Sequence, residues 1–79
     1  YIKNMEIMNR ITIDPEIMGG KPCIRGMRVT VAMIVHLIAE GYNREEILSA
    51  FPYIENEDIT AALQYAAFRV DEIENPIAV

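Results

Sequence analysis

The chain has 79 residues, 52% of them hydrophobic, and a formal net charge of −5 at pH 7. This hydrophobic content excludes a disordered polypeptide, and the length fits a single domain. No apolar run approaches the roughly 18 residues that a membrane-spanning helix needs, and no charged-then-apolar leader is visible, so the sequence indicates neither a membrane nor secretion.

The single cysteine, Cys23, and the single histidine, His36, limit the ways in which so short a chain can be stabilised. One cysteine excludes an internal disulfide, and one cysteine with one histidine is too few for a structural zinc site. Small domains without these aids commonly associate with another chain. We therefore expect a homodimer with no metal and no other cofactor. An unpaired thiol fits the reducing cytoplasm.

The charges are unevenly distributed along the chain. Residues 1–30 carry five basic and three acidic side chains, a net charge of +2, whereas residues 31–79 carry two basic and nine acidic side chains, a net charge of −7. An anionic partner such as DNA is therefore expected to meet the N-terminal third, and the remainder is expected to repel it.

The first third of the chain predicts a β-hairpin. The segments RITID, residues 10–14, and MRVTV, residues 27–31, alternate polar and apolar side chains and contain β-branched residues, as half-buried strands do. A connection rich in Gly and Pro separates them. Two strands alone are only marginally stable in water, so they are expected to pack on helices or on another chain.

From residue 30 onward the apolar spacing predicts helices. The first helix has Thr30 as its N-cap and Gly41 as its C-terminal glycine, and its apolar side chains fall on one face. That face consists of Val31, Ile34, Val35 and Ile38. A second helix starts at Asn43, with Glu46 completing a capping box, and ends at Pro52. Its buried side consists of Ile47, Leu48 and Phe51.

The third helix is predicted to begin near Asn56, with Glu57 and Asp58 placed where the helix dipole favours acids. Its core stripe consists of Ile59, Ala62, Leu63, Ala66 and Val70. We expect it to fray over residues 69–72. The predicted fold is therefore mainly α, with a short N-terminal β-hairpin followed by three helices, and the tight link between the second and third helices suits a helix-turn-helix. The single domain would comprise an N-terminal segment with the hairpin (1–30), the bundle (31–72) and a loose tail (73–79).

The stretch GGKPCIRG, residues 19–26, has the composition of a binding site. A phosphate-binding P-loop needs a further glycine ahead of the glycine–lysine pair and a Ser or Thr after it, and both are missing. A nucleophilic Cys23 would need an acid–base partner, but His36 lies on the first helix, so a small packed thiol is the simpler interpretation. We interpret the stretch as a stiff connection that directs cations towards an anionic partner. The candidates for contact with DNA phosphates are Arg10, Lys21, Arg25 and Arg28.

The third helix would be the recognition helix of a helix-turn-helix. Its candidates for base readout are Thr60, Gln64 and Arg69. Against this interpretation, Glu57 and Asp58 lie at the end of the helix that normally enters the groove. The same helix carries a second apolar stripe, Ala61, Tyr65 and Phe68, at helical spacing. Two interpretations of this stripe stay open: it contacts a partner, or the segment YIKNMEIM, residues 1–8, folds over it.

Two segments together resemble a known family. These are RITIDPEIMGGKPCIRGMRVTV and IAEGYNREEILSAFPYIENEDITAALQYAA, and the resemblance covers about residues 10–67. The family is a bacterial and archaeal one catalogued as domain of unknown function 433. Its members look like small antitoxins, many of them partners of a nuclease-like PIN-domain toxin, with a homeodomain-like three-helix unit behind a β-hairpin. The resemblance implies binding of double-stranded operator DNA and of a PIN-like toxin, and it carries over no catalytic residues.

Two residues depart from the family pattern. Thr30 stands where the family usually has Pro, and Glu55 stands where it usually has Thr or Ser as the cap of the third helix. Asn56 can take over that capping role. Glu55 also adds negative charge to the candidate recognition helix, which weakens the DNA hypothesis.

Three functional hypotheses follow. The first is a non-enzymatic cytoplasmic antitoxin-like protein that binds operator DNA and a toxin. The second is a protein-interaction module that neutralises a toxin, or forms an oligomer, without binding DNA. The third is an enzyme that uses Cys23, which we expect not to hold.

Overall fold

The N-terminal part of the protein forms a very short antiparallel hairpin. In the computed structural model, residues 9–74 are described. Strand β1 (Ile11–Thr12) pairs with β2 (Cys23–Ile24), so that Ile11 lies opposite Ile24 and Thr12 lies opposite Cys23. The 3-10 turn η1 (Met18–Gly20) lies between the two strands.

The second strand is not where the sequence pattern predicts it, because the chain reverses direction earlier. Arg25 and Gly26 both have positive φ, +43° and +75°, which is the backbone of a tight type I′-like turn. The amide of Met27 donates to the carbonyl of Ile24 across this turn (2.7 Å). The predicted strand over residues 27–31 is reduced to an antiparallel bridge between Thr30 and Cys23, and the strand that pairs with β1 lies inside GGKPCIRG. Likewise, β1 is shorter than the predicted 10–14.

The first long helix, α2 (Val31–Ala39), begins as predicted. Thr30 is its N-cap, and the Thr30 hydroxyl accepts a hydrogen bond from the amide of Met33 (3.0 Å). Beyond its C-terminal end, Gly41 has a φ of +98°, a conformation that favours glycine. His36 is exposed, as expected for a position beside the apolar face.

The second helix, α3 (Arg44–Ala50), also begins as predicted. The side chain of Asn43 accepts from the amide of Glu46, and the Glu46 carboxylate accepts from the amide of Asn43, both at 2.8 Å. This reciprocal pair satisfies two amides that the helix itself leaves unbonded.

The third helix, α4 (Asn56–Glu74), is the longest and differs from the prediction at its C-terminal end. It runs through the residues 69–72 at which fraying was expected and continues to Glu74, so two residues of the predicted tail are helical. Val70, predicted to lie in the core, is 50% exposed. The N-terminal segment 1–8 and the rest of the tail, 75–79, lie outside the described residues.

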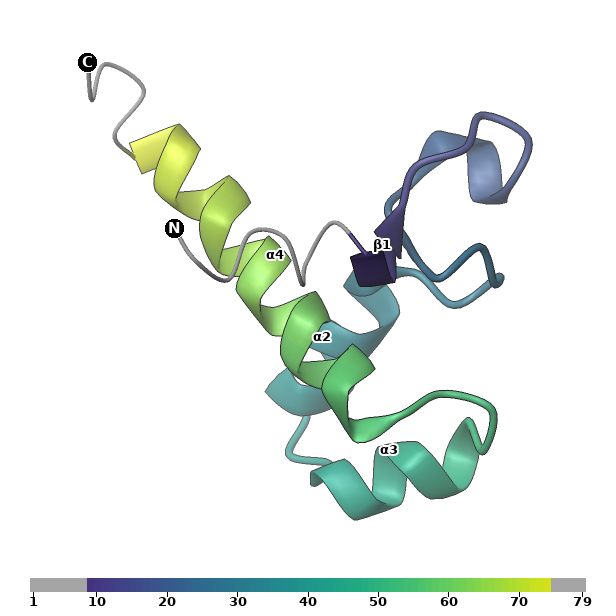
Figure 1. Ribbon diagram of the computed structural model, residues 1–79. Coiled ribbons are helices and arrows are strands. Elements are labelled where there is room, and N and C mark those ends of the chain that lie inside the picture. The colour runs from purple at the N-terminus through teal and green to yellow at the C-terminus, as the bar shows by residue number, and fades with distance from the viewer. Residues whose placement is uncertain (1–8, 75–79) are drawn as a thin grey trace.

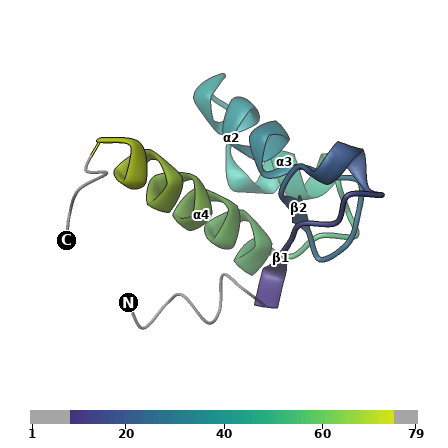
Figure 2. The ribbon, with the colours of Figure 1, turned by 90° about the horizontal axis from the view of Figure 1, so that it is seen from above.

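The core lies where α2 packs against the first half of α4, with α3 and the hairpin closing the sides (Figures 1 and 2). The fully buried large apolar side chains come from every layer: Ile24, Ile34, Ile47 and Ile59. Both views show the C-terminal half of α4 projecting beyond α2 and α3. The predicted mainly helical fold, a small three-helix bundle with a short N-terminal hairpin, is confirmed.

Candidate interaction site at the start of α4

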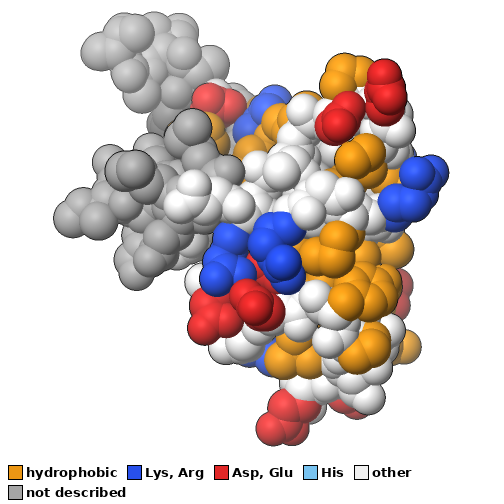
Figure 3. All heavy atoms as spheres, turned by 45° about the vertical axis from the view of Figure 1, so that its right-hand side comes forward, with side chains coloured by type: hydrophobic (Ala, Val, Ile, Leu, Met, Phe, Trp, Pro, Cys, Tyr) orange, Lys and Arg blue, Asp and Glu red, His pale blue; other side chains and the backbone are white. Residues whose placement is uncertain are grey.

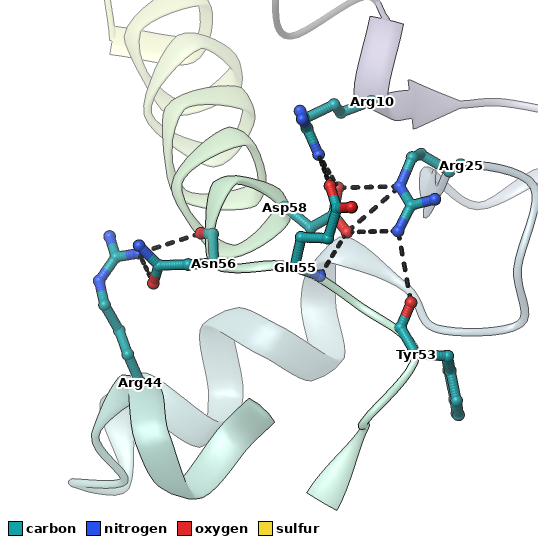
Figure 4. Close-up of polar contacts among 7 residues, drawn as sticks. All are labelled: Arg10, Arg25, Arg44, Tyr53, Glu55, Asn56 and Asp58. Atoms are coloured by element: carbon teal, nitrogen blue, oxygen red, sulfur yellow. Dashed lines mark hydrogen bonds and ion pairs between the residues drawn. The ribbon is translucent and has the colours of Figure 1, made fainter. Parts of the chain in front are cut away.

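A buried carboxylate connects α4 to the hairpin. Asp58 is 0% exposed, and its two oxygens accept from Arg10 Nη1 (2.8 Å) and Arg25 Nη2 (2.8 Å). Arg25 Nε adds a second contact with Oδ1 at 3.1 Å, and the amide of Glu55 donates to Oδ2 at 2.8 Å (Figure 4). Every lone pair that burial would otherwise leave unsatisfied thus has a donor, which is the condition under which a buried charge is tolerated.

Local structure brings these groups together. Arg10 directly precedes β1 and Arg25 directly follows β2, and the antiparallel register sets them side by side, with the amide of Arg25 donating to the carbonyl of Arg10 (2.9 Å). Asp58 sits in the first turn of α4, three residues after Glu55, where a side-chain acceptor can reach back to the residue that precedes the helix. The cluster therefore pins the hairpin onto the N-terminus of α4.

The pKa of Asp58 shows how the cluster is balanced. Burial by itself would raise this pKa, but hydrogen bonds from Arg25, from the amide of Glu55 and from Arg10 outweigh it and hold the pKa below its ordinary value. Hydrogen bonds to the carboxylates of Glu55 and Asp58 raise the pKa of Arg10, and the bond to Asp58 raises the pKa of Arg25. All three groups are charged at neutral pH.

Around the cluster, weaker polar contacts fix the start of α4. Glu55, whose side chain is 58% exposed, accepts from Arg10 at 2.8 Å. Arg44 on α3 donates to the side-chain oxygen of Asn56 at 2.8 Å and to its carbonyl at 3.2 Å. Asn56 is itself the first residue of the helix, so its predicted role as the cap is wrong. Instead, Asp58 accepts the amide of Glu55.

A surface hollow opens directly above the cluster. It is lined by Asn9, Arg10, Arg25, Glu55, Glu57, Thr60, Ala61 and Gln64. Figure 3 shows basic and acidic side chains side by side on one face of the molecule, with apolar side chains next to them. Among the described residues of the hollow and its floor, two guanidinium groups face three carboxylates, Glu55, Glu57 and Asp58, so the net charge is −1.

The structure separates the four cations predicted to contact DNA phosphates into two pairs. Arg10 and Arg25 are held by carboxylates and are not free to neutralise an added anion. Lys21 and Arg28 are exposed, and within residues 9–74 neither side chain takes part in a hydrogen bond or salt bridge. Both lower the pKa of Cys23 electrostatically, so they lie near the same part of the hairpin.

The candidates on α4 are divided in the same way. Thr60 and Gln64 line the hollow beside the two arginines. Arg69 lies nine residues beyond Thr60, roughly 13 Å along a helix, and contacts the hydroxyl of Tyr65 (3.4 Å) and Glu72 (3.4 Å). The three predicted base-reading residues therefore do not form one group.

The second apolar stripe of α4 is only partly available to a partner. Ala61 is 3% exposed and belongs to the core, so its prediction as an interface residue is wrong. The reason is that the helix faces Ala61 towards the hairpin side of the bundle, where sequence spacing alone cannot show a neighbour. Tyr65 is half-buried and Phe68 is 42% exposed.

Cys23 has the environment of a structural thiol. It is 1% exposed, and its sulfur donates to the carbonyl of Lys21 at 3.2 Å. Burial raises its pKa in spite of the opposing charges of Arg28 and Lys21. A buried thiol that holds its proton is a poor nucleophile, which argues against chemistry at Cys23.

The residue that the sequence reading missed is Asp58. It was assigned to the helix dipole alone, yet it is the centre of the polar cluster. A signal did exist in the sequence: an acid three residues after the residue that precedes a helix, here Glu55, commonly accepts a hydrogen bond from the amide of that residue. Its arginine partners, 33 and 48 residues away, could not be deduced from spacing.

A metal site and a membrane-spanning helix were the two remaining features to consider in the described part of the chain. Within residues 9–74, no cluster of three or more His, Cys, Asp or Glu residues is arranged to hold a metal ion. None of the helices in this range combines the length and apolar character that crossing a membrane would take.

Comparison with known proteins identifies the family. A family model described as "Protein of unknown function (DUF433)" matches residues 11–66, and the chain belongs to this family. A crystal structure of a DUF433 member from Anabaena variabilis ATCC 29413 superposes with a TM-score of 0.76 at 29% identity. The match covers 99% of this chain and 78% of that one. The shared fold therefore includes the hairpin and the three helices of residues 9–74.

A curated relative is similar over a shorter region. The uncharacterized protein y4eO of Sinorhizobium fredii (strain NBRC 101917 / NGR234) is 39% identical over 56 residues, which is 71% of this chain. The matched segment spans 25% of that relative's length. This chain therefore matches only about a quarter of that protein.

Proposed function

We propose that this chain is a non-enzymatic interaction module of an antitoxin-like protein, and that it binds a basic partner protein through the hollow at the start of α4 and the outer face of α4 beyond it. The charged and apolar side chains of this surface are suited to binding another protein. The unpaired Cys23 fits the cytoplasm as the compartment.

The observation that carries this proposal is the occupation of Arg10 and Arg25 by Asp58 and Glu55. With both arginines paired, the helix end that would enter a DNA groove carries a net charge of −1, which disfavours phosphates there and favours a basic protein surface. Gln64 lines the hollow, and the exposed ring of Phe68, four residues further along α4, extends the same side of the helix. Aromatic side chains next to polar groups are typical of protein interfaces.

The family resemblance suggests the kind of partner. A PIN-like nuclease must bind an anionic nucleic acid, so its active face is expected to be basic. An acidic module can cover such a face as a mimic of nucleic acid. The net charge of −7 over residues 31–79 supports the same interpretation.

A pair of charge reversals tests the proposal. Glu57 and Glu45 are both exposed, and each is the second residue of its helix, α4 and α3 respectively, so reversal costs each helix a similar dipole interaction. Glu57→Lys is expected to weaken binding to a PIN-like protein at least tenfold in calorimetry. Glu45→Lys is the matched control and is expected to leave the affinity within about twofold. Equal effects of the two variants, or no complex with the wild type, would contradict the proposal.

Operator DNA binding is the second candidate function, and one specific observation favours it. Lys21 and Arg28 are exposed cations without a hydrogen-bond or salt-bridge partner among residues 9–74, and both are carried by the hairpin region. Such side chains are suited to phosphate contacts. In this case, DNA would meet the hairpin.

Salt-dependent DNA titration separates the two functions. If phosphates contact Lys21 and Arg28, Lys21→Ala and Arg28→Ala each reduce the slope of log affinity against log salt by about one unit. Arg44→Ala, a cation on α3, serves as the control with an unchanged slope. Absence of binding to labelled promoter DNA at low salt would leave the protein-binding function alone.

A further inference from the structure

The apolar stripe that seats α4 on the bundle continues after the bundle ends. Its members recur at alternating steps of four and three residues, which keeps them on one helix face. They are Ile59, Leu63, Ala66, Val70 and Ile73. Along this face the exposed fraction rises from 0% at Ile59 to 50% at Val70 and 74% at Ile73. The same face is therefore core at one end of the helix and surface at the other.

The arrangement of the helices explains this change. Figures 1 and 2 both show the C-terminal half of α4 projecting past α2 and α3. Val70 and Ile73 belong to this half of the helix and are largely exposed. From Leu63 to Glu74 the helix measures roughly 18 Å at 1.5 Å per residue. A contiguous apolar stripe on a projecting helix gains free energy when another surface covers it.

The charges beside the stripe are self-complementary. Arg69 and Glu72 lie on the same edge of it, with Nε and Oε1 3.4 Å apart within one chain. If a second copy packs antiparallel about a two-fold axis near Val70, the same edges face each other. Arg69 of each copy then lies opposite Glu72 of the other, and the contact occurs twice, as an isologous interface requires.

The position of the bundle selects the antiparallel direction. Each bundle occupies the stripe side of α4 at its N-terminal half, as the burial of Ile59 and Ala62 shows. Two parallel copies would bring both bundles into the space between the helices, whereas antiparallel copies place them at opposite ends. We propose that the C-terminal half of α4 is a dimerisation face, on which a second copy of this chain packs antiparallel through Val70 and Ile73.

The size of this face sets the expected affinity. Its exposed residues, 67–74, span about two helical turns, which places it at the small end of specific interfaces. Association in the micromolar range is expected, so the monomer of 9.0 kDa and the dimer coexist at ordinary concentrations.

Sedimentation of the full chain over a range of concentrations tests the face. The double variant Val70→Lys/Ile73→Lys removes both apolar contacts at positions that are already exposed, so the fold is kept while dimerisation weakens at least tenfold. Ile13→Lys, an isoleucine of 59% exposure outside α4, is the matched control and dimerises like the wild type. A 9.0 kDa species at every concentration of the wild type, or equal weakening by the control, overturns the proposal.

Charge exchange tests the direction of packing. Arg69→Glu sets like charges against each other and weakens the dimer several-fold, and Arg69→Glu/Glu72→Arg restores it. Circular dichroism of the dilute monomer checks that the helix content of the variants is equal. Restoration by Arg69→Glu/Glu74→Arg in place of that pair would indicate a parallel arrangement and overturn the antiparallel one.

Discussion

The two ends of α4 differ in the kind of side chain that each buries or exposes. At its start, a charged side chain is fully buried: Asp58 is 0% exposed and is satisfied by two arginines and one backbone amide. Towards its end, apolar side chains are exposed: Ile73 is 74% exposed. In a domain of this size, a buried charge with a full set of donors and an uncovered apolar stripe are both unusual.

The two ends of α4 therefore differ in their role in the fold. The first turn fixes the hairpin to the bundle, because Arg10 and Arg25 reach Asp58 from either side of the strand pair. The last turns contribute little to the stability of the monomer, because they project away from α2 and α3. Surfaces that stability does not constrain are the ones available for contact with other molecules.

The largest expected effect on the free energy of unfolding comes from comparing two isoleucines, one near each end of α4. Ile59 and Ile73 lie on the same face of α4, fully buried and 74% exposed respectively. Ile59→Ala leaves a cavity in the core and is expected to lower the free energy of unfolding by about 2–5 kcal/mol. Ile73→Ala is the matched control, with a change of about 0.5 kcal/mol or less. Urea denaturation at low protein concentration, where the proposed dimer would be dissociated, measures both. Similar losses would mean that the last turns also stabilise the monomer.

The second prediction concerns the charged centre of the first turn. Asp58→Asn keeps the shape of the side chain but removes the charge that three donors share, and is expected to lower the free energy of unfolding by about 2–3 kcal/mol. The figure is below that of a fully buried pair, because Arg10 and Arg25 are 28% and 35% exposed and can recover water. Glu57→Gln is the control and is expected to be near neutral. A neutral Asp58→Asn would show that the cluster only sets the position of the hairpin.

The pH dependence of stability follows from the same carboxylate. Its pKa is lower in the folded protein than its ordinary value, so the unfolded chain binds a proton more readily. The contribution of Asp58 is therefore complete above about pH 4, the ordinary pKa of an aspartate, and is lost as the pH falls through the lower folded pKa. Thermal melts from pH 7 to pH 2 are expected to show a steeper acid loss in the wild type than in Asp58→Asn. Parallel curves would contradict the assignment.

The helices of the bundle could be predicted from the sequence because their signals are local. Thr30, Asn43 with Glu46, and Gly41 act within one or two turns of chain, and all of them occupy the predicted positions. The second strand was misplaced for the opposite reason. The alternation of residues 27–31 reflects burial of Val29 and Val31, and the turn at Arg25 and Gly26 folds this segment back onto Cys23. The partner of β1 is the segment Cys23–Ile24, which is too short to show an alternation.

The site could be predicted only in part, because the sequence shows which residues are charged but not which residues form ion pairs with them. The positive net charge of the N-terminal third suggested free cations. Arg10 and Arg25 instead form ion pairs with Asp58, which is more than 30 residues away in the sequence. Lys21 and Arg28 are the cations of that group left exposed without such a partner among residues 9–74. Long-range ion pairs depend on tertiary contact, which periodicity does not encode.

The smallest expected effect compares two arginines at the two ends of α4. Arg25 makes several charge-assisted bonds to one buried carboxylate, whereas Arg69 pairs with exposed Glu72 at 3.4 Å. Exposed helix pairs of this spacing contribute about 0.2–0.5 kcal/mol, so Arg69→Ala is expected to change the free energy of unfolding of the monomer by no more than that. Arg25→Ala is expected to cost more, because it leaves Asp58 with Arg10 as its sole guanidinium partner among the described residues. Urea denaturation of the two variants at matched low concentration measures the difference. If Arg69→Ala proved as costly as Arg25→Ala, the last turns of α4 would be part of the folded core, and the contrast between a fixed start and a free end would fail.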